Sequence, residues 1–224
     1  MEKQLEIEIL ESIRGIEQEL NNLKIIGIDE LEIDKTAIIV VDVVNGFINE
    51  GSLADKSISR IIPNIKMLLD NLVGAKKLFF LDEHTPESEE LKTYPEHCMI
   101  GSRESEIVSE LKPYTAKNAS VITKNSTNGY HAEAFQVWLD ENLDDLESIV
   151  IVGDCTDICI SQFALTLKTV FNEWNMPIRI IVPKNCVDTY DAKAIYHHAV
   201  LKNYMALYDM KSNGIEVVEA IADK

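Results

Sequence analysis

The stretch SIVIVGDCTDICISQFALT, residues 148–166, contains the transition that decides the fold. An apolar run rich in Val and Ile ends at Gly153, a short polar turn follows, and a helical pattern begins near Cys159. A continuous apolar run of this length, bounded by a turn, is typical of a strand buried on both faces of a sheet. The stretch also raises a chemical question, because Cys155 and Cys159 are either reactive groups or merely small residues in a tight turn.

Five further apolar runs of the same kind occur along the chain. They are TAIIVVD (36–42), KLFFLDEH (77–84), SVITK (120–124), IRIIVP (178–183) and IEVVEA (215–220). Amphipathic helical patterns lie between them. This alternation predicts an α/β fold with a doubly wound, mainly parallel sheet of about six strands and helices on both faces. No Gly-rich phosphate loop follows the first strand, which argues against a nucleotide site.

The first 34 residues differ from the rest and predict an N-terminal helical extension. Acidic residues there alternate with apolar ones that recur at intervals of three and four. The apolar residues are Leu5, Ile9, Ile13, Ile16, Leu20 and Leu23. This spacing predicts an amphipathic helix that packs on its own domain or on a partner subunit. We therefore divide the chain into an extension (1–34) and a catalytic-type domain (35–224).

Composition and charge narrow the class of protein. The formal net charge of −17 over 224 residues argues against nucleic acid or an anionic membrane surface as a partner. No apolar run reaches the roughly 18 residues of a membrane-spanning helix, and the charged start MEKQLEIEILE does not resemble a signal peptide. The sequence therefore predicts a cytoplasmic protein with reduced cysteines. The four cysteines are too scattered to suggest a structural zinc site.

The carboxyl ends of the predicted strands carry reactive side chains. In open α/β sheets, ligands bind beyond these ends. The residues found there are Asp42, Asp82, His84, Lys124 and the turn 154–159. One acid, one metal-type pair, one amine and one thiol thus come from four different strands, and we expect them to meet in one site.

Cys159 is the candidate nucleophile of this site. It begins a helical pattern, so the positive end of the helix dipole would favour its thiolate. Asp42 could accept the thiol proton, and Lys124 could stabilise the resulting charge. The alternative is that Cys159 is a buried small residue, Asp42 a cap and Lys124 a surface amine; three complementary strand ends favour the catalytic interpretation.

A second group of residues suggests a metal site. Asp82 and His84 flank one residue at the end of a strand, and His97 follows in YPEHC. One carboxylate and two imidazoles can hold a divalent transition metal with positions left open. An Asp-x-His pair also arises by chance, and Zn, Mn, Fe and Mg all remain candidates for the ion. The remaining histidines, His131, His197 and His198, lie in helical patterns and are interpreted as structural.

Three motifs together resemble a known family. VVDVVNGF, ITKNSTNGYHAEAF and GDCTDICISQFA are similar to motifs of the isochorismatase-like cysteine hydrolases, nearest to the nicotinamidase and pyrazinamidase amidohydrolases. The resemblance runs from about residue 36 to residue 218. It implies a catalytic triad of Asp42, Lys124 and Cys159. It also implies a cis peptide between Cys155 and Thr156 and an oxyanion hole formed by the backbone N–H groups of Cys155 and Cys159.

The same resemblance implies the metal ligands and part of the substrate pocket. The segment PEHCMIG matches the family's metal loop, which makes Asp82, His84 and His97 the implied ligands and Glu90 a fourth candidate beside Glu87 and Glu89. Phe47 and Tyr94 match positions that stack on the substrate ring, although Phe47 could equally be a core residue. The chain departs from the nicotinamidase pattern at Val44, Gly46, Glu83 and Phe163. These departures alter the pocket walls and leave the triad intact.

The sequence therefore predicts a metal-dependent cysteine amidohydrolase. We expect it to cleave a small, nicotinamide-like carboxamide to acid and ammonia through a thioester. Two alternatives stay open: a ureido, carbamoyl or isochorismatase-type hydrolase of the same fold, and a non-catalytic metal-binding or interaction protein. The resemblance also implies a homo-oligomer.

Overall fold

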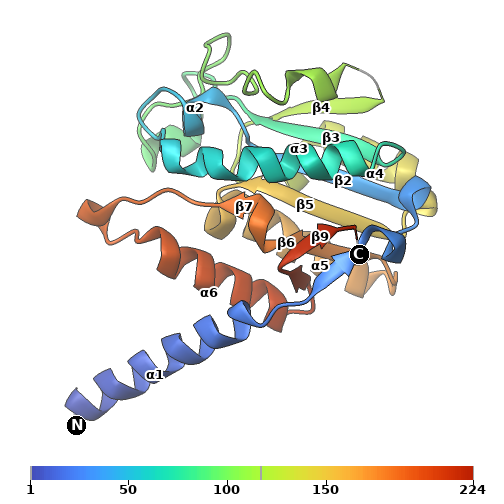
Figure 1. The fold of residues 1–224 in the computed structure, drawn as a ribbon. Coiled ribbons are helices and arrows are strands. Elements are labelled where there is room, and N and C mark those ends of the chain that lie inside the picture. The colour runs from blue at the N-terminus through green and yellow to red at the C-terminus, as the bar shows by residue number, and fades with distance from the viewer. Residues whose placement is uncertain (1, 117, 224) are drawn as a thin grey trace.

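The structure is a computed structural model that describes residues 2–116 and 118–223. Its centre is a seven-stranded parallel sheet in the order β4-β3-β2-β5-β6-β8, with β7 paired to β5 (Figure 1). The strands are β2 (Thr36–Val41), β3 (Lys76–Asp82), β4 (Ala119–Lys124), β5 (Ser148–Asp154), β6 (Arg179–Pro183), β7 (Val187–Asp188) and β8 (Glu216–Val218). This confirms the predicted fold class. The seventh strand, β7, was not predicted because two residues are too short to form a recognisable apolar run.

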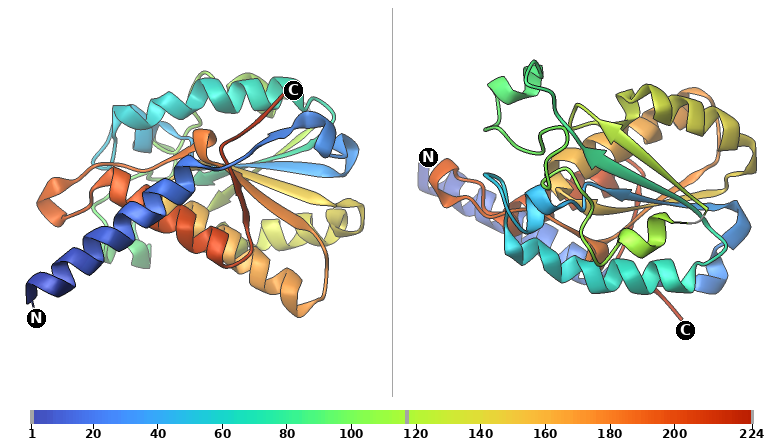
Figure 2. Two further views of the ribbon diagram at one scale, coloured as in Figure 1. Left: turned by 60° about the horizontal axis from the view of Figure 1, so that its bottom comes forward. Right: turned by 90° about the horizontal axis from the view of Figure 1, so that it is seen from above.

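Helices cover both faces of the sheet (Figure 2). One face packs against α3 (Ile62–Asn71), and the other packs against α4 (Glu133–Asn142), α5 (Ser161–Glu173) and α6 (Ala199–Ser212). Alternate residues of β2 contribute to the two cores: Ile38 and Val40 to one, Ile39 and Val41 to the other. Side chains buried on both faces explain why these strands read as continuous apolar runs rather than as an alternating pattern.

The N-terminal extension is only partly helical. Helix α1 (Glu2–Asn21) is followed by β1 (Ile25–Gly27), which pairs in parallel with β9 (Ala220–Ala222), and then by two short 3-10 turns. The extension is therefore joined to the end of the chain, a pairing that its three-residue strands did not reveal. Among the described residues, no helix combines the length and apolar character needed to cross a membrane.

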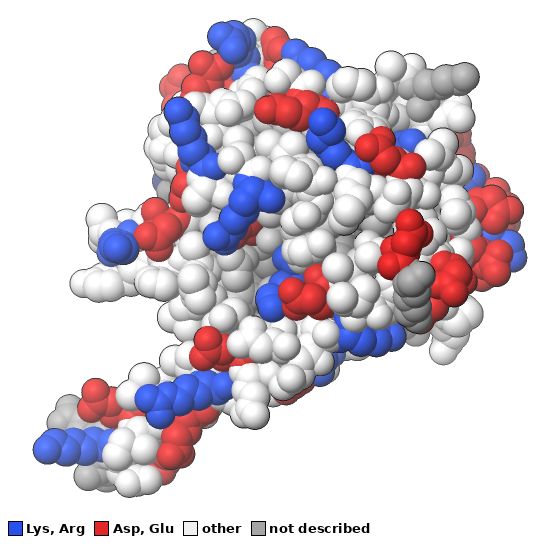
Figure 3. All heavy atoms as spheres, viewed as in Figure 1, with Lys and Arg blue, Asp and Glu red and all other residues white. Residues whose placement is uncertain are grey.

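Only the C-terminal part of α1 packs closely on the domain. Leu20 is fully buried, whereas Leu5 and Ile9 are 57% and 52% exposed. The helix projects from the body of the protein (Figures 1 and 2), and residues of both charge signs are interspersed with uncharged ones along it (Figure 3). The predicted amphipathic pattern is therefore present, but half of its apolar face has no partner among the described residues of this chain.

The carboxyl ends of the four neighbouring strands β4, β3, β2 and β5 lie side by side. Asp82 is in register with Lys124 on β4, and Gly153 of β5 is in register with Val41 of β2. Gly153 has φ of 120°, and a Cβ atom at this position would lie 2.0 Å from the carbonyl oxygen of Val41. A side chain cannot fit there. Strands β2 and β5 therefore approach each other closely at the point where the chain enters the site.

Candidate active site

Lys124 joins two acidic side chains at the sheet edge. Its Nζ lies 2.8 Å from Oδ2 of Asp42, which follows β2, and 2.8 Å from Oδ1 of Asp82, the last residue of β3. All three side chains are at most 1% exposed. Each strand end thus contributes one charge, and the cation between two anions offsets the cost of removing all three from water.

The two carboxyl groups respond to this environment in opposite ways. Burial raises the pKa of Asp42 to about 7; the charge of Lys124 opposes this rise, and that of Asp82 adds to it. Burial also acts on Asp82, but Lys124 and hydrogen bonds from His84 and His97 outweigh it and hold its pKa well below the usual range. Lys124 itself keeps a raised pKa, because the two carboxylates outweigh its desolvation. Asp42 is therefore the group poised to exchange a proton near neutral pH.

Cys155 and Cys159 lie at the start and in the middle of the turn that follows β5. Residues Thr156–Ile160 form a single π-helical turn before α5, in which the N–H groups of Ile158 and Ile160 both donate to the carbonyl oxygen of Cys155, at 3.1 and 3.2 Å. The cis peptide joins Asp154 to Cys155, so the position predicted for it, between Cys155 and Thr156, is wrong by one residue. The reason is that the chain leaves the sheet directly after Asp154, where β5 ends.

The Cys159 thiol is buried, with 6% of the residue exposed. Burial raises its pKa well above the ordinary value; Lys124 partly opposes this rise, and the negative charge of Asp42 adds to it. This differs from the expectation that a helix N-terminus would favour the thiolate, because desolvation outweighs the dipole and Cys159 lies in the π-helical turn, two residues ahead of α5. A reaction at this thiol would therefore require a base to remove its proton, and the buried Asp42 is the nearest candidate by its raised pKa.

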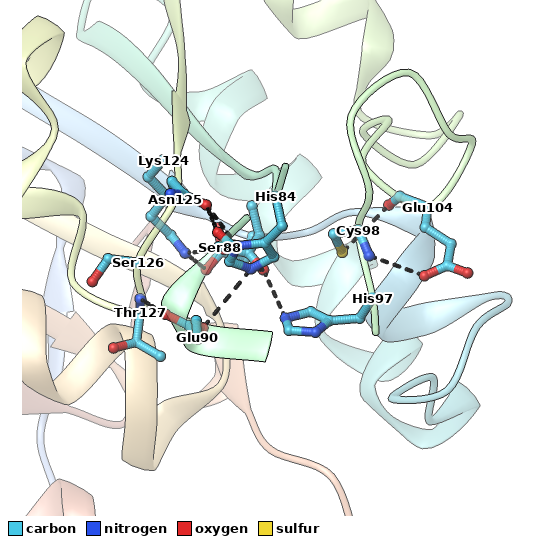
Figure 4. Close-up of polar contacts among 12 residues, drawn as sticks. His84, Ser88, Glu90, His97, Cys98, Glu104, Lys124, Asn125, Ser126 and Thr127 are labelled. Atoms are coloured by element: carbon cyan, nitrogen blue, oxygen red, sulfur yellow. Dashed lines mark hydrogen bonds and ion pairs between the residues drawn. The ribbon is translucent and has the colours of Figure 1, made fainter. Parts of the chain in front are cut away.

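A cluster of four metal-type side chains adjoins this triad. One potential ligand atom from each residue lies within 4.8 Å of all the others: Asp82, His84, Glu90 and His97. Nε2 of His84 and Nε2 of His97 are 2.9 and 3.1 Å from Oδ2 of Asp82. Figure 4 shows that the side chains of His84, Glu90 and His97 converge on one point. Two imidazoles and two carboxylates in this arrangement match the donor set of a divalent transition metal.

Neighbouring groups hold the cluster in place. Nδ1 of His84 is 2.9 Å from Oδ1 of Asn125, and Nδ1 of His97 is 2.7 Å from the carbonyl oxygen of Pro95. The N–H group of Thr127 donates to Oε2 of Glu90 at 2.9 Å. Partners of this kind leave the Nε2 atoms of both histidines directed at the cluster. Burial disfavours the charged form of His84, but the hydrogen bond and charge of Asp82 outweigh it and raise the pKa of His84.

Glu90 occupies the open side of the cluster. Its Oε1 lies 3.8 Å from Nε2 of His84, and its side chain is 15% exposed. The neighbouring carboxylate of Glu89 points elsewhere and pairs with Lys92 at the surface. The structure thus separates Glu90 from this neighbour as a potential ligand, which the sequence alone could not do.

One pocket connects the triad to the cluster. It is lined by Phe47, Leu53, Asp82, Glu90, Tyr94, His97, Thr127, Cys155, Ile158, Cys159 and Tyr190. The rings of Phe47 and Tyr94 lie 5.7 and 6.2 Å from the ring of His97. The predicted nucleophile Cys159, the ring-stacking pair and three of the four predicted metal ligands therefore border one space; the fourth, His84, is buried behind it.

Sequence reasoning missed four of the lining residues: Leu53, Thr127, Ile158 and Tyr190. Tyr190 follows the two-residue strand β7, so the rule that ligands sit beyond strand ends would have found it if β7 had been recognised. The other three occupy connecting segments or the turn, where the sequence pattern carries no signal.

The remaining candidates lie outside the cluster. Cys98 is fully buried beside the backbone of Glu104, and burial raises its pKa far above the ordinary value. His131 lies in a 3-10 turn, and His197 and His198 precede α6 rather than belonging to it. The predicted helical placement of these three histidines is therefore wrong. The chain can enter α6 only after the left-handed turn at Tyr196, whose φ is 60°.

The fold agrees with the comparison to protein families. Residues 36–217 match the isochorismatase domain. The chain therefore belongs to the isochorismatase family, and its class is hydrolase.

Among individual relatives, the chain is 31% identical to Nicotinamidase 1 of Arabidopsis thaliana over 213 residues, which cover 83% of this chain and 86% of that protein. Its fold is similar to that of N-carbamoylsarcosine amidase from Thermoplasma acidophilum, with a TM-score of 0.65 and 24% identity over 82% of this chain and 95% of the other. It is also similar to that of the pyrazinamidase of Pyrococcus horikoshii, solved in complex with zinc, with a TM-score of 0.66 and 21% identity over 83% and 99% of the two chains.

Proposed function

We propose that the protein is a metal-dependent cysteine amidohydrolase that cleaves a small, planar carboxamide of the nicotinamide type to acid and ammonia. The observation that supports this proposal is the pocket that Cys159 borders together with Asp82, Glu90 and His97, close to the buried pair of Asp42 and Lys124. The similarity to a nicotinamidase over most of both chains supports the same reaction class.

The chemistry follows from the positions of the triad. Asp42 accepts the thiol proton of Cys159, and the sulfur attacks the amide carbon. Lys124 stabilises the negative charge as it moves from carboxylate to sulfur. The backbone N–H groups of Cys155 and Cys159 would hold the oxyanion, and each such donor is typically worth about 2.7–4 kcal/mol. Asp42 then returns the proton to the leaving nitrogen, ammonia departs, and a thioester remains.

Hydrolysis of the thioester completes the cycle. Water attacks the acyl carbon, Asp42 accepts one of its protons, and the carbon–sulfur bond breaks. The acid product leaves, and the proton held by Asp42 returns to the sulfur of Cys159. The pKa of about 7 for Asp42 suits both directions of transfer, because an acid–base catalyst works best when its pKa is close to the working pH.

The four-residue cluster fits a divalent metal. The close approach of four ligand atoms around a single point, with both imidazoles oriented by outer hydrogen bonds, is the observation on which this assignment rests. Asp82, His84, His97 and Glu90 would hold the ion, which when bound supplies a Lewis acid for a substrate nitrogen or for water. Asp82 has a second role independent of the ion, because its other oxygen pairs with Lys124.

The pocket walls indicate the shape of the substrate. Three aromatic side chains, Phe47, Tyr94 and Tyr190, border a space that ends at Cys159. A flat ring carrying a carboxamide would place its faces against these rings and its amide carbon against the sulfur. Stacking of this kind contributes about 0.5–1.5 kcal/mol beyond the area buried.

Ammonia release from a panel of amides tests the proposal. Nicotinamide and pyrazinamide are compared with carbamoyl and ureido compounds, using wild type, Cys159→Ala and Cys186→Ala, with and without added divalent metal. Cys186 is a matched control, because it is buried but does not line the pocket. We expect turnover of the aromatic amides by wild type and Cys186→Ala, and none by Cys159→Ala.

Other results would change the assignment. Turnover of only the carbamoyl or ureido compounds would keep the mechanism and replace the substrate class. Full activity in Cys159→Ala would contradict the nucleophile. Silence across the panel with metal present would favour a binding role instead.

Two further properties are part of the proposal. A reducing compartment such as the cytoplasm would keep Cys159 as a free thiol, in agreement with four unpaired cysteines. A homo-oligomer would cover the exposed apolar residues of α1.

A further inference from the structure

The turn that carries the nucleophile is fastened to a second segment of the chain. Asp157 lies in this turn between Cys155 and Cys159. Its Oδ1 accepts a hydrogen bond from Oγ1 of Thr189 at 2.7 Å, and its Oδ2 lies 2.9 Å from Nε2 of His197. Both partners belong to the segment 189–198, which runs from the end of β7 to the start of α6. The turn and this segment are therefore linked through one carboxylate.

His197 also makes two contacts with Tyr190. Its Nδ1 lies 2.9 Å from the carbonyl oxygen of Tyr190, and its ring stacks on the ring of Tyr190 with centroids 3.9 Å apart and planes 6° from parallel. His197 is 6% exposed. The buried His197 side chain thus contacts Asp157 through its ring nitrogen Nε2 and contacts Tyr190 through the face of its ring. Nζ of Lys202 also lies near Asp157 but is more distant, at 3.8 Å from Oδ2.

Tyr190 is a wall of the pocket, on the same space as Cys159, Phe47 and Tyr94. His197 does not line this pocket and lies behind the Tyr190 ring. It therefore touches neither the nucleophile nor the substrate space, but it contacts one residue from the turn that carries the nucleophile and one residue that faces the substrate.

We propose that His197 is a positioning residue that fixes the Tyr190 wall of the pocket and the turn bearing Cys159 in one mutual arrangement. The inference rests on the proposed function for its catalytic readout. Its two contacts have separable consequences. The stacked ring orients Tyr190 and thereby sets how well the substrate ring binds, whereas the bond to Asp157 sets where the sulfur lies relative to the amide carbon.

Two substitutions separate these contacts. His197→Phe keeps a flat ring against Tyr190 and removes the bond to Asp157 together with the contact to the Tyr190 carbonyl oxygen. His197→Gln keeps a donor that can reach Asp157 and removes the ring. His198→Gln is the matched control, because His198 is the neighbouring histidine, is exposed, and makes no side-chain cap bond at the start of α6.

We expect one His197 variant to change mainly kcat and the other to change mainly KM. His197→Phe lowers kcat by about tenfold or more with KM within about twofold, because a small displacement of a reacting group costs rate rather than binding. His197→Gln raises KM by about three- to tenfold with kcat within about twofold, the range expected for loss of one stacking contact. His198→Gln behaves as wild type in both.

Hydrogen exchange provides a readout that does not depend on activity. The amides of residues 155–160 should exchange faster in His197→Phe than in His197→Gln or His198→Gln. Thermal melting gives each variant's melting temperature, and exchange is compared at the same number of degrees below it. If wild type hydrolyses no amide, the proposed function fails, and this comparison alone decides whether His197 holds the turn.

Three results would overturn the inference. The first is a pair of His197 variants that lower stability while their folded fractions keep wild-type kcat and KM, as a purely structural residue would. The second is a pair in which the phenylalanine and glutamine variants change kcat and KM in the same way. The third is exchange of residues 155–160 that is unchanged in His197→Phe.

Discussion

Asp42 and Asp82 occupy equivalent places and behave oppositely. Each stands at the carboxyl end of one of two neighbouring parallel strands, is buried, and has an oxygen 2.8 Å from the same Lys124 nitrogen. Yet the pKa of Asp42 is raised to about 7, and that of Asp82 is lowered. The difference arises because two imidazoles also contact Asp82, whereas Lys124, with a smaller contribution from a Cys159 hydrogen bond, opposes the burial of Asp42.

The comparison teaches that the partners a buried acid has besides Lys124 decide its protonation state. An acid with one cationic partner keeps a proton that it can exchange, whereas an acid with three donors stays ionised. Lys124 is common to both, so the proton-transfer side and the metal side of the site are electrostatically connected. The following predictions test this division, from the largest expected effect to the smallest.

Loss of the shared cation should have the largest effect. In Lys124→Met, two buried carboxyl groups lose their common partner, and we expect the free energy of unfolding to fall by about 3–5 kcal/mol, as when one member of a buried ion pair is removed. Urea denaturation measures this change. Lys92→Met is the control: Lys92 pairs with Glu89 at the surface, where both side chains are mostly exposed, and little change is expected. Equal stability of the two variants would refute the bridging role of Lys124.

Asp42→Asn and Asp82→Asn should separate the two sides. Asp42→Asn removes the proton acceptor, and we expect kcat to fall by about 100- to 10,000-fold while bound metal is retained. Asp82→Asn removes a ligand that contacts both imidazoles, and we expect loss of bound metal after dialysis. Metal content is measured by atomic emission and turnover by ammonia release, with Asp140→Asn on the exposed face of α4 as the control. Loss of metal in Asp42→Asn would show that the division between the acids is wrong.

The pH dependence of kcat/KM should report Asp42. Below about pH 7 the carboxyl group is protonated and cannot accept the thiol proton, so kcat/KM should fall about tenfold per pH unit. Stability changes in the opposite direction. Because the folded pKa lies above the unfolded value of 3.8, this group favours folding most below about pH 4, and the benefit is lost as the pH rises through 7. A flat activity profile between pH 5 and 8 would be inconsistent with Asp42 as the base.

Glu90→Gln should have the smallest effect. Glu90 Oε1 is 3.8 Å from His84, farther than the atoms of Asp82 are from either histidine. We expect metal affinity to weaken by about tenfold without being abolished. Titration with a metal-sensitive dye measures this affinity, and Glu89→Gln is the matched control. Equal affinity in both variants would remove Glu90 from the ligand set and leave Asp82 as the acidic ligand.

The sequence predicted the residues at the strand ends of the site because buried strands are recognisable as apolar runs. Continuous Val- and Ile-rich runs located the strand ends, and Asp42, Asp82 and Lys124 followed from them. Where strands are short, this signal disappears. Strand β7 has two residues, so Tyr190 was missed, and the three-residue pair β1 and β9 was missed for the same reason.

Features that depend on tertiary surroundings were also beyond the sequence. The pattern around Cys159 predicted a favoured thiolate, but the thiol is buried so completely that desolvation raises its pKa. His197 was interpreted as a helical residue. Its actual position depends on the left-handed turn at Tyr196, a conformation that the residue type does not signal.

Because Gly153 has no side chain, it allows Asp42 and the turn with Cys159 to lie close together. A single added methyl group would meet the Val41 carbonyl oxygen at 2.0 Å, so strands β2 and β5 would have to separate, and Asp42 and the cysteine turn would move apart with them. In a library of all substitutions at this position, only the original residue should yield active enzyme. The site thus depends on a residue that offers it no functional group.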